Sequence, residues 1–187
     1  FFCFVSTPAV HAPWQAHPEK LKELKNRGVE GNAKEMALYS MIENIDDNIG
    51  EIIDYLNFMD LRKNTLVIIA TDQGMRYRGL DNPSPVEHFS LPDHVFDYRH
   101  RVFCMMQYPD INKSSYKFTS LTGVVDITPT ILDVCGIPVP SNMDGKSLKP
   151  LLKGNDEEWD DDRTLIIQCP RQRERVKNQN VSIKTNQ

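Results

Sequence analysis

The sequence predicts an α/β fold that ends in the start of a small antiparallel β subdomain. Apolar residues recur at threes and fours from Ala33 to Leu61, which is the spacing of an amphipathic helix. Thr65 to Ala70 is a continuous β-branched apolar run, typical of a strand in a covered parallel sheet. Residues 164–168 and 181–184 can pair as an antiparallel hairpin. These patterns predict an α/β domain over residues 1–155, followed by the start of the smaller subdomain over 156–187.

The elements before the long helix are predicted from apolar runs and prolines. Phe1 to Ser6 is apolar and predicts a buried strand. A loop with prolines at positions 8 and 13 follows, because proline disfavours both helix interiors and ladder pairing. The charged stretch 18–27 predicts a short helix. Acidic side chains between the apolar positions of helix 33–61 are read as a solvated face, with catalytic carboxylates as the alternative.

After the strand at 65–70, the sequence predicts a loop, another strand and two helices. Arg101 to Gln107 predicts another buried strand, and the long irregular stretch 75–100 before it is typical of a functional loop. Residues 128–135 predict a helix, with Pro129 near its start and a glycine past its end. Residues 144–152 predict a further short helix.

Composition excludes several functional classes. The net charge is −4 and the pI about 5.7, which argues against a nucleic-acid-binding surface. No apolar run approaches the roughly 20 residues that a membrane span needs. The basic cluster 171–177 is short and is read as a solvated face. The four cysteines are far apart, lack metal-ligand spacing, and are expected to be buried, inert thiols.

Polar side chains follow two of the predicted strands, where α/β folds place their sites. His11 lies just past the first strand, and Asp72 and Gln73 lie just past the run at 65–70. A carboxylate beside an amide oxygen offers hard ligands suited to Ca²⁺ or, less favourably, Mg²⁺. Taken alone, this turn is also an ordinary end to a strand.

An ensemble of motifs carries a family resemblance. It consists of His11-Ala12-Pro13, Met41 to Gly50, Asn64 to Ile68, Thr71-Asp72-Gln73-Gly74, Asp126 to Leu132, Gly136-Ile137-Pro138 and Asp144 to Leu152. In order and spacing, these segments resemble the C-terminal part of the sulfatase (arylsulfatase-like) family within the alkaline phosphatase superfamily. The resemblance covers nearly the whole chain. It implies part of an alkaline-phosphatase-like sheet flanked by helices.

The resemblance also implies roles for individual residues. A histidine matching His11 contacts the sulfate or the leaving group, and Asp72 and Gln73 match calcium ligands. The family's nucleophile is a formylglycine made from a Cys or Ser in the N-terminal half, and none of the four cysteines has its motif. The chain is therefore expected to need the N-terminal half of the same protein, and to be inactive without it.

One loop departs from the family pattern. Where the family has a sulfate-binding Lys in a glycine-rich stretch, this sequence has residues 93–101, and His94 aligns with the Lys. We expect His94 to act as a catalytic cation, with Arg99 and His100 binding substrate. A histidine cation would make binding pH-dependent, because its pKa lies near 6.5. The alternatives are ordinary surface residues or a degenerate loop.

Three functions remain open from the sequence. The first is hydrolysis of a sulfate ester, carried by a sulfated small molecule or glycan. The second is a phosphodiesterase or phosphonate ester hydrolase on the same scaffold. The third is a non-catalytic relative that binds a sulfated glycan. From the family, a secreted, periplasmic or lysosomal location is expected, with no nucleic-acid or membrane partner.

Overall fold

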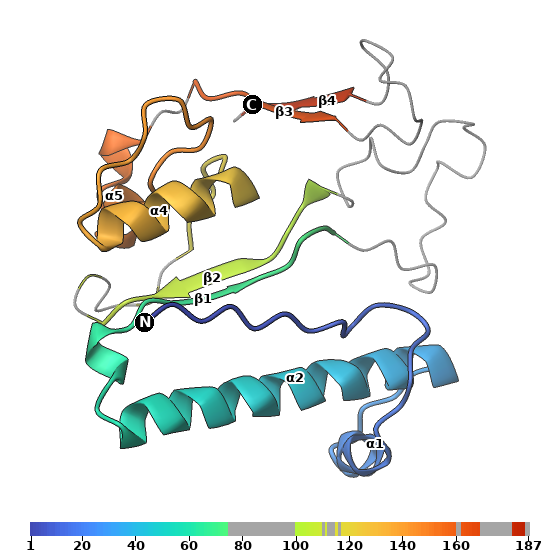
Figure 1. The fold of residues 1–187 in the computed structure, drawn as a ribbon. Helices are drawn as coiled ribbons and strands as arrows, with labels where there is room; N and C mark the ends of the chain where they lie inside the picture. The colour runs from blue at the N-terminus through green and yellow to red at the C-terminus, as the bar shows by residue number, and fades with distance from the viewer. Residues whose placement is uncertain are drawn as a thin grey trace. The chain divides into compact units, whose positions relative to one another are not determined.

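The computed structural model describes most of the chain, and Figure 1 shows its helices and strands. The described residues are 1–74, 100–109, 111, 115, 117–159, 162–168 and 181–185. They form two compact units, Phe1–Arg62 and Lys63–Gln187. A 3₁₀ turn, η1 (Arg62–Asn64), lies where the two units join in sequence. The predicted subdomain boundary at 155/156 falls inside the second unit and stays a prediction.

The first unit contains two helices, α1 (Pro18–Asn26) and α2 (Ala33–Phe58). Both agree with the predicted helices. A proline at its start favours α1 there, since the ring fixes φ and a missing N–H costs nothing in the first turn. Asn32 caps α2 by accepting from the backbone N–H groups of Lys34 and Glu35, while the Glu35 carboxylate accepts from the Asn32 N–H.

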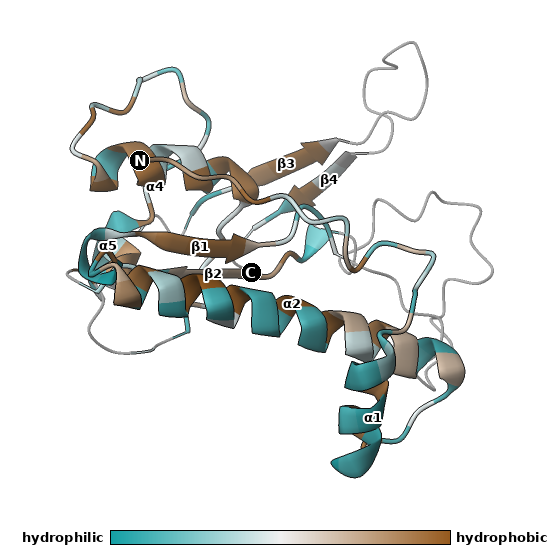
Figure 2. Cartoon of the chain, turned by 60° about the horizontal axis from the view of Figure 1, so that its bottom comes forward, coloured by the Kyte–Doolittle hydropathy of each residue, from teal (hydrophilic) through white to brown (hydrophobic). Residues whose placement is uncertain are grey.

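Helices α1 and α2 contact each other, and the ion pair between Lys20 and Asp47 joins them. Leu24 of α1 and Leu38 of α2 are both buried. Lys20 forms ion pairs with Glu23 and Asp47, which hold its pKa above the ordinary range. Figure 2 shows hydrophilic and hydrophobic residues alternating along α2, as the sequence predicts for a half-buried helix.

The N-terminal segment differs from its prediction. Residues 1–6 form no strand, and Phe1, Phe2, Phe4 and Val5 are exposed. Apolar residues make a strand only when a neighbouring strand satisfies their backbone groups. Among the described residues, no strand pairs with residues 1–6.

The second unit begins with a pair of strands. β1 (Val67–Ala70) pairs with β2 (Cys104–Gln107), with Val67 opposite Gln107 and Ala70 opposite Cys104. The sequence predicts that β1 belongs to a parallel sheet. The strand that pairs with it among the described residues, β2, is antiparallel to it. β2 is also mostly exposed rather than buried.

Helices and a second hairpin complete this unit. A 3₁₀ turn, η4 (Val124–Asp126), leads into α4 (Ile127–Val134), and α5 (Lys149–Leu152) is followed by η5 (Asp156–Glu158). β3 (Leu165–Gln168) and β4 (Val181–Lys184) pair antiparallel, which confirms the predicted hairpin. A core of Leu148, Leu151 and Trp159 packs against Met106 and Phe118.

The cysteines differ from their prediction. Cys3, Cys104 and Cys135 are exposed, so the expectation of buried thiols is wrong for them. Cys3 lies in the unpaired N-terminal segment and Cys135 at the C-terminal cap of α4, where no core covers them.

Within the described part of the chain, no helix combines the length and apolar character needed to cross a membrane.

Candidate active site

His11 lies in a loop that hydrogen bonds among its own residues hold closed. The His11 backbone N–H donates to the Pro8 carbonyl at 2.8 Å, and the Ala9 N–H donates to the Thr7 hydroxyl at 3.2 Å. The Trp14 indole Nε1 donates to the Val10 carbonyl at 3.1 Å. These bonds lie on both sides of His11 in sequence, so the loop fixes its backbone locally.

The His11 side chain is exposed, and one ring nitrogen is already engaged. Nδ1 lies 2.6 Å from the carbonyl oxygen of Ala12. The ring is therefore held against its own loop by one edge. The contact of His11 with a substrate stays a prediction.

Asp72 and Gln73 follow β1 where its pairing with β2 ends. The Thr71 N–H donates to the Phe103 carbonyl, and the Phe103 N–H donates to the Thr71 hydroxyl, both at 3.0 Å. The first bond extends the backbone ladder by one step, and in the second the Thr71 side chain accepts from the partner strand in place of a backbone carbonyl. Asp72 and Gln73 are both exposed in the turn that follows. The strand thus presents a carboxylate and an amide at its carboxyl end, as predicted.

The chemistry of this donor pair fits a hard cation. Ca²⁺ prefers carboxylate and amide oxygens, and takes about six to eight of them. Asp72 and Gln73 supply two such side chains. In the stretches that the structure describes, no group of three or more His, Cys, Asp or Glu side chains is gathered to hold a metal. The pair would therefore be part of a larger ligand shell.

The other predicted site residues are only partly described. His94 and Arg99 lie outside the described residues. His100 is helical and half-buried, and Arg101 beside it is exposed. His11 belongs to the first compact unit, whereas Asp72, Gln73 and His100 belong to the second.

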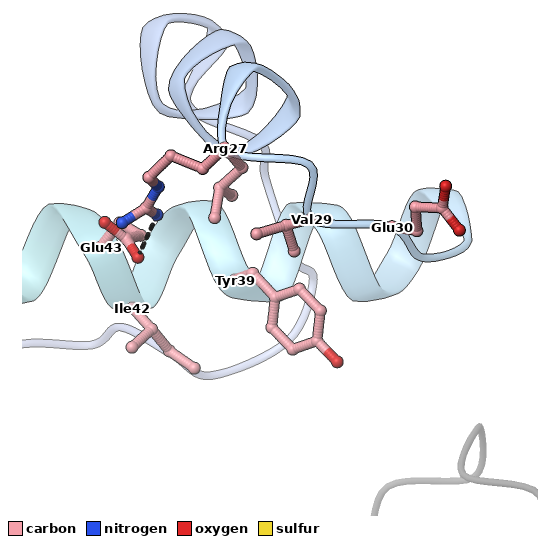
Figure 3. A pocket seen from close by; sticks show the side chains of 7 residues that line it. Arg27, Val29, Glu30, Tyr39, Ile42 and Glu43 are labelled. Carbon is pink, nitrogen blue, oxygen red and sulfur yellow. Dashed lines mark hydrogen bonds and ion pairs between the residues drawn. The ribbon is translucent and has the colours of Figure 1, made fainter.

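A hollow of about 580 Å³ lies in the first unit, in the corner between α1 and α2 (Figure 3). Leu24, Val29 and Ile42 line it together with the Arg27–Glu43 ion pair, which joins Nη2 to Oε1 at 2.6 Å. The hydrogen bond from Arg27 to Glu43 raises the pKa of the guanidinium. The four site residues that the structure describes, His11, Asp72, Gln73 and His100, do not line this hollow.

Sequence reasoning missed the part that Trp14 plays in the His11 loop. Its indole N–H donates to the Val10 carbonyl, four residues earlier, so His11 lies between the two bonded residues in sequence. The signal was present in the sequence, since a tryptophan is a donor without acceptor capacity and follows a proline-rich loop.

Comparison with family models gives two matches that together span the chain. Residues 1–137 match the model described as "Sulfatase". Residues 91–186 match the model described as "N-sulphoglucosamine sulphohydrolase, C-terminal". The first match includes His11, Asp72 and Gln73, together with the loop at 93–101.

Curated relatives carry sulfatase names. The chain is 34% identical to arylsulfatase K of Homo sapiens over 116 residues, covering 60% of this chain and 20% of the relative. It is 32% identical over 116 residues to N-acetylglucosamine-6-O-sulfatase of Bacteroides thetaiotaomicron, covering 58% and 18%. It is 25% identical over 188 residues to human N-acetylglucosamine-6-sulfatase, covering 82% and 32%. The chain thus spans less than a third of the length of these relatives.

Solved structures share the fold. The chain matches the structure of Ps i-CgsB with a TM-score of 0.65 and 22% identity, over 79% of this chain and 32% of that chain. It matches the phosphonate monoester hydrolase SpPMH from Silicibacter pomeroyi with a TM-score of 0.55 and 20% identity, over 87% and 30%. These likenesses confirm the predicted α/β fold class. The family model matched over residues 1–137 shows that the chain belongs to the sulfatase family.

Proposed function

We propose that this chain is the C-terminal part of an enzyme that hydrolyses sulfate esters. The observation that carries the proposal is the match of residues 1–137 to the sulfatase model, which includes an exposed His11 and the oxygen pair Asp72–Gln73. The chain covers 20% of human arylsulfatase K. The N-terminal half of the same protein would supply the remaining ligands and the formylglycine nucleophile.

Asp72 and Gln73 would hold a calcium ion together with ligands from that half. Calcium, when bound, would neutralise negative charge on the sulfate oxygens. The antiparallel ladder that stops at Thr71 holds the start of this turn in place. Asp72 would contribute a charged ligand and Gln73 a neutral one, and hard oxygen donors of this kind favour Ca²⁺ over softer metals.

His11 would contact a sulfate oxygen or the leaving group. A histidine can donate a hydrogen bond to an oxygen that gains negative charge, and it can transfer a proton to a leaving oxygen. The exposed ring and the fixed loop backbone support this role. His94 would provide a second cationic contact, and Arg99 and His100 would bind the ester, because they occupy the stretch where the family has its sulfate-binding Lys.

We also propose a sulfated sugar as the substrate. Two of the relatives are named for 6-sulfated N-acetylglucosamine, and residues 91–186 match a model named for a sulphoglucosamine sulphohydrolase. The protein would be secreted, periplasmic or lysosomal, where it would meet a sulfated glycan.

A phosphodiesterase or phosphonate ester hydrolase is the second candidate. It is kept because the fold of SpPMH matches 87% of this chain. A phosphodiester, a phosphonate monoester and a sulfate monoester each carry one negative charge near neutral pH, so the two activities are separated by rates on the matching esters. The loop at 93–101 keeps a third candidate, a glycan-binding relative without turnover.

The test is an ester panel with the full-length protein, made together with a formylglycine-generating enzyme. 4-Nitrophenyl sulfate, phosphate and phenylphosphonate would be assayed with N-acetylglucosamine 6-sulfate, each with and without Ca²⁺. We expect calcium-dependent release of sulfate. Preferential cleavage of the phosphorus esters would support the second candidate. Binding of the sulfated sugar without turnover, with formylglycine confirmed by mass spectrometry, would support the third.

A further inference from the structure

We propose that Trp14 is a positioning residue for His11, and that the loop it closes presents Nε2 of the imidazole to the sulfate ester. The inference rests on the proposed function, because it takes His11 as a substrate contact. Nothing in the resemblance to the family assigns a role to Trp14.

The first step is the geometry of the closure. Trp14 Nε1 donates to the Val10 carbonyl, which is the backbone group directly before His11. The bond is 3.1 Å long and partly buried, so water competes with it less than with an exposed bond. The indole thus holds the peptide unit from which His11 projects.

The second step concerns the ring of His11. A carbonyl oxygen only accepts, so the 2.6 Å contact between Nδ1 and the Ala12 oxygen requires a proton on Nδ1. In a neutral imidazole the other nitrogen, Nε2, then carries the lone pair. The loop therefore selects one tautomer and leaves Nε2 as the nitrogen that can take up a proton. Nε2 can donate to a sulfate oxygen or to the leaving oxygen only after it has taken up that proton, while Nδ1–H keeps its bond to the Ala12 carbonyl.

The third step links the two. Val10 and Ala12 flank His11. Trp14 donates to the Val10 carbonyl, and the His11 ring donates to the Ala12 carbonyl. If the indole bond is lost, the peptide unit before His11 can rotate, and the ring can leave the Ala12 carbonyl. A misplacement of a reacting group by about 1 Å can cost on the order of 100-fold in rate.

The test is the variant Trp14→Phe in the full-length protein, which keeps an aromatic ring and removes the N–H donor. We expect kcat/KM on the best substrate of the panel to fall by about 10- to 100-fold. The calcium concentration needed for half-maximal activity should not change, because Asp72 and Gln73 lie outside the loop. In ¹⁵N spectra of histidine-labelled protein, His11 should change from the Nδ1-protonated pattern to an average of both tautomers.

The chain offers a matched control in Trp159→Phe. Trp159 is the other tryptophan, it is buried, and its Nε1 has no hydrogen-bond partner among the described residues. This variant makes the same chemical change without removing an N–H bond, and its kcat/KM and its His11 spectrum should match those of the wild type.

A double substitution separates positioning from a general loss of folding. In the background of His11→Ala, Trp14→Phe should cause little further loss of rate, because the residue it positions is gone. Additive losses would overturn the proposal, as would wild-type kcat/KM and an unchanged His11 spectrum in Trp14→Phe. If the wild-type protein cleaves no ester, the proposed function fails. In that case the ¹⁵N spectra alone still support or overturn the positioning of His11.

Discussion

Arg163 forms two parallel hydrogen bonds with Asp126, from Nη1 to Oδ2 at 2.7 Å and from Nη2 to Oδ1 at 2.6 Å. The side chains are 5% and 0% exposed. The Asp126 carboxylate also accepts from the backbone N–H groups of Gly123 and Lys146, and Trp159 lies against the guanidinium. Asp126 lies at the start of α4, and Arg163 lies beyond η5. The pair therefore anchors the segment after residue 155 to α4.

Removing one partner of this pair should strongly destabilise the second unit. Arg163→Met leaves the Asp126 carboxylate buried without its counter-charge, which typically costs about 3–5 kcal/mol. Urea unfolding of the full-length protein measures the loss. Arg27→Met is the matched control, because Arg27 also makes a 2.6 Å ion pair but on the surface. A loss for Arg163→Met no larger than that of the control would contradict this account.

Gly145 is expected to tolerate no side chain. A Cβ at this position would overlap the carbonyl oxygen of Val125, which belongs to the backbone just before Asp126. We expect Gly145→Ala to lower the melting temperature clearly. Gly50→Ala, in α2 with nothing near its Cβ, should instead stabilise by up to about 1 kcal/mol, because alanine favours helix. Equal melting temperatures for the two variants would show that the turn at Gly145 has room.

The capping box at the start of α2 gives a third prediction. Asn32→Ala removes the acceptor for two backbone N–H groups and should cost about 1 kcal/mol in the free energy of unfolding. Asn32→Ser should recover most of it. Asn48→Ala, a substitution of the same type inside α2, serves as the control and should be nearly neutral. Urea unfolding that fails to separate the two alanine variants would remove the cap from this account.

Asp133 gives a prediction about pH. Partial burial by itself raises the pKa of this carboxyl, but hydrogen bonds from Lys149 and Ser147 and the charge of Lys153 outweigh it and hold the pKa below its ordinary value. Because the folded pKa is depressed, the stabilisation is present above the unfolded pKa of about 3.9 and is lost as the pH falls below it.

The measurement is the stability difference between wild type and Asp133→Asn across pH. The variant should be less stable at pH 7, by less than about 1 kcal/mol because the pair is partly exposed. The difference should shrink as the pH falls below about 4. Asp54→Asn, an exposed carboxylate of α2, controls for a general charge effect. A difference for Asp133→Asn that stays constant with pH would rule out the link to Lys149.

The sequence predicted the helices best, because their signals are local. The period of apolar residues in 33–61, and the proline and glycine around 128–136, depend only on neighbours in the chain. Both helices are present, as α2 and α4. The hairpin of β3 and β4 was also predicted, from two matching apolar segments.

Strand partners were predicted less well, because pairing depends on residues distant in sequence. The apolar run at 65–70 gave a strand, but its pairing with β2 is antiparallel. Phe1 to Ser6 had the composition of a strand and has no described partner. In the same way, no pattern linked Asp126 to Arg163, which are 37 residues apart. The site residues were chosen from motifs, and their roles stay predictions.

The central claim, that His11 and Asp72 serve hydrolysis of a sulfate ester, is tested most directly by kinetics of the full-length protein carrying formylglycine. The measurement is kcat/KM for sulfate release across a calcium titration, in wild type, His11→Ala, Asp72→Ala and the control Asp54→Ala. We predict a loss of about 10²- to 10⁴-fold for His11→Ala without a shift in the calcium midpoint. For Asp72→Ala we predict a large shift of that midpoint to higher calcium, and for the control no change. Wild-type kcat/KM and calcium dependence in both site variants would contradict the claim.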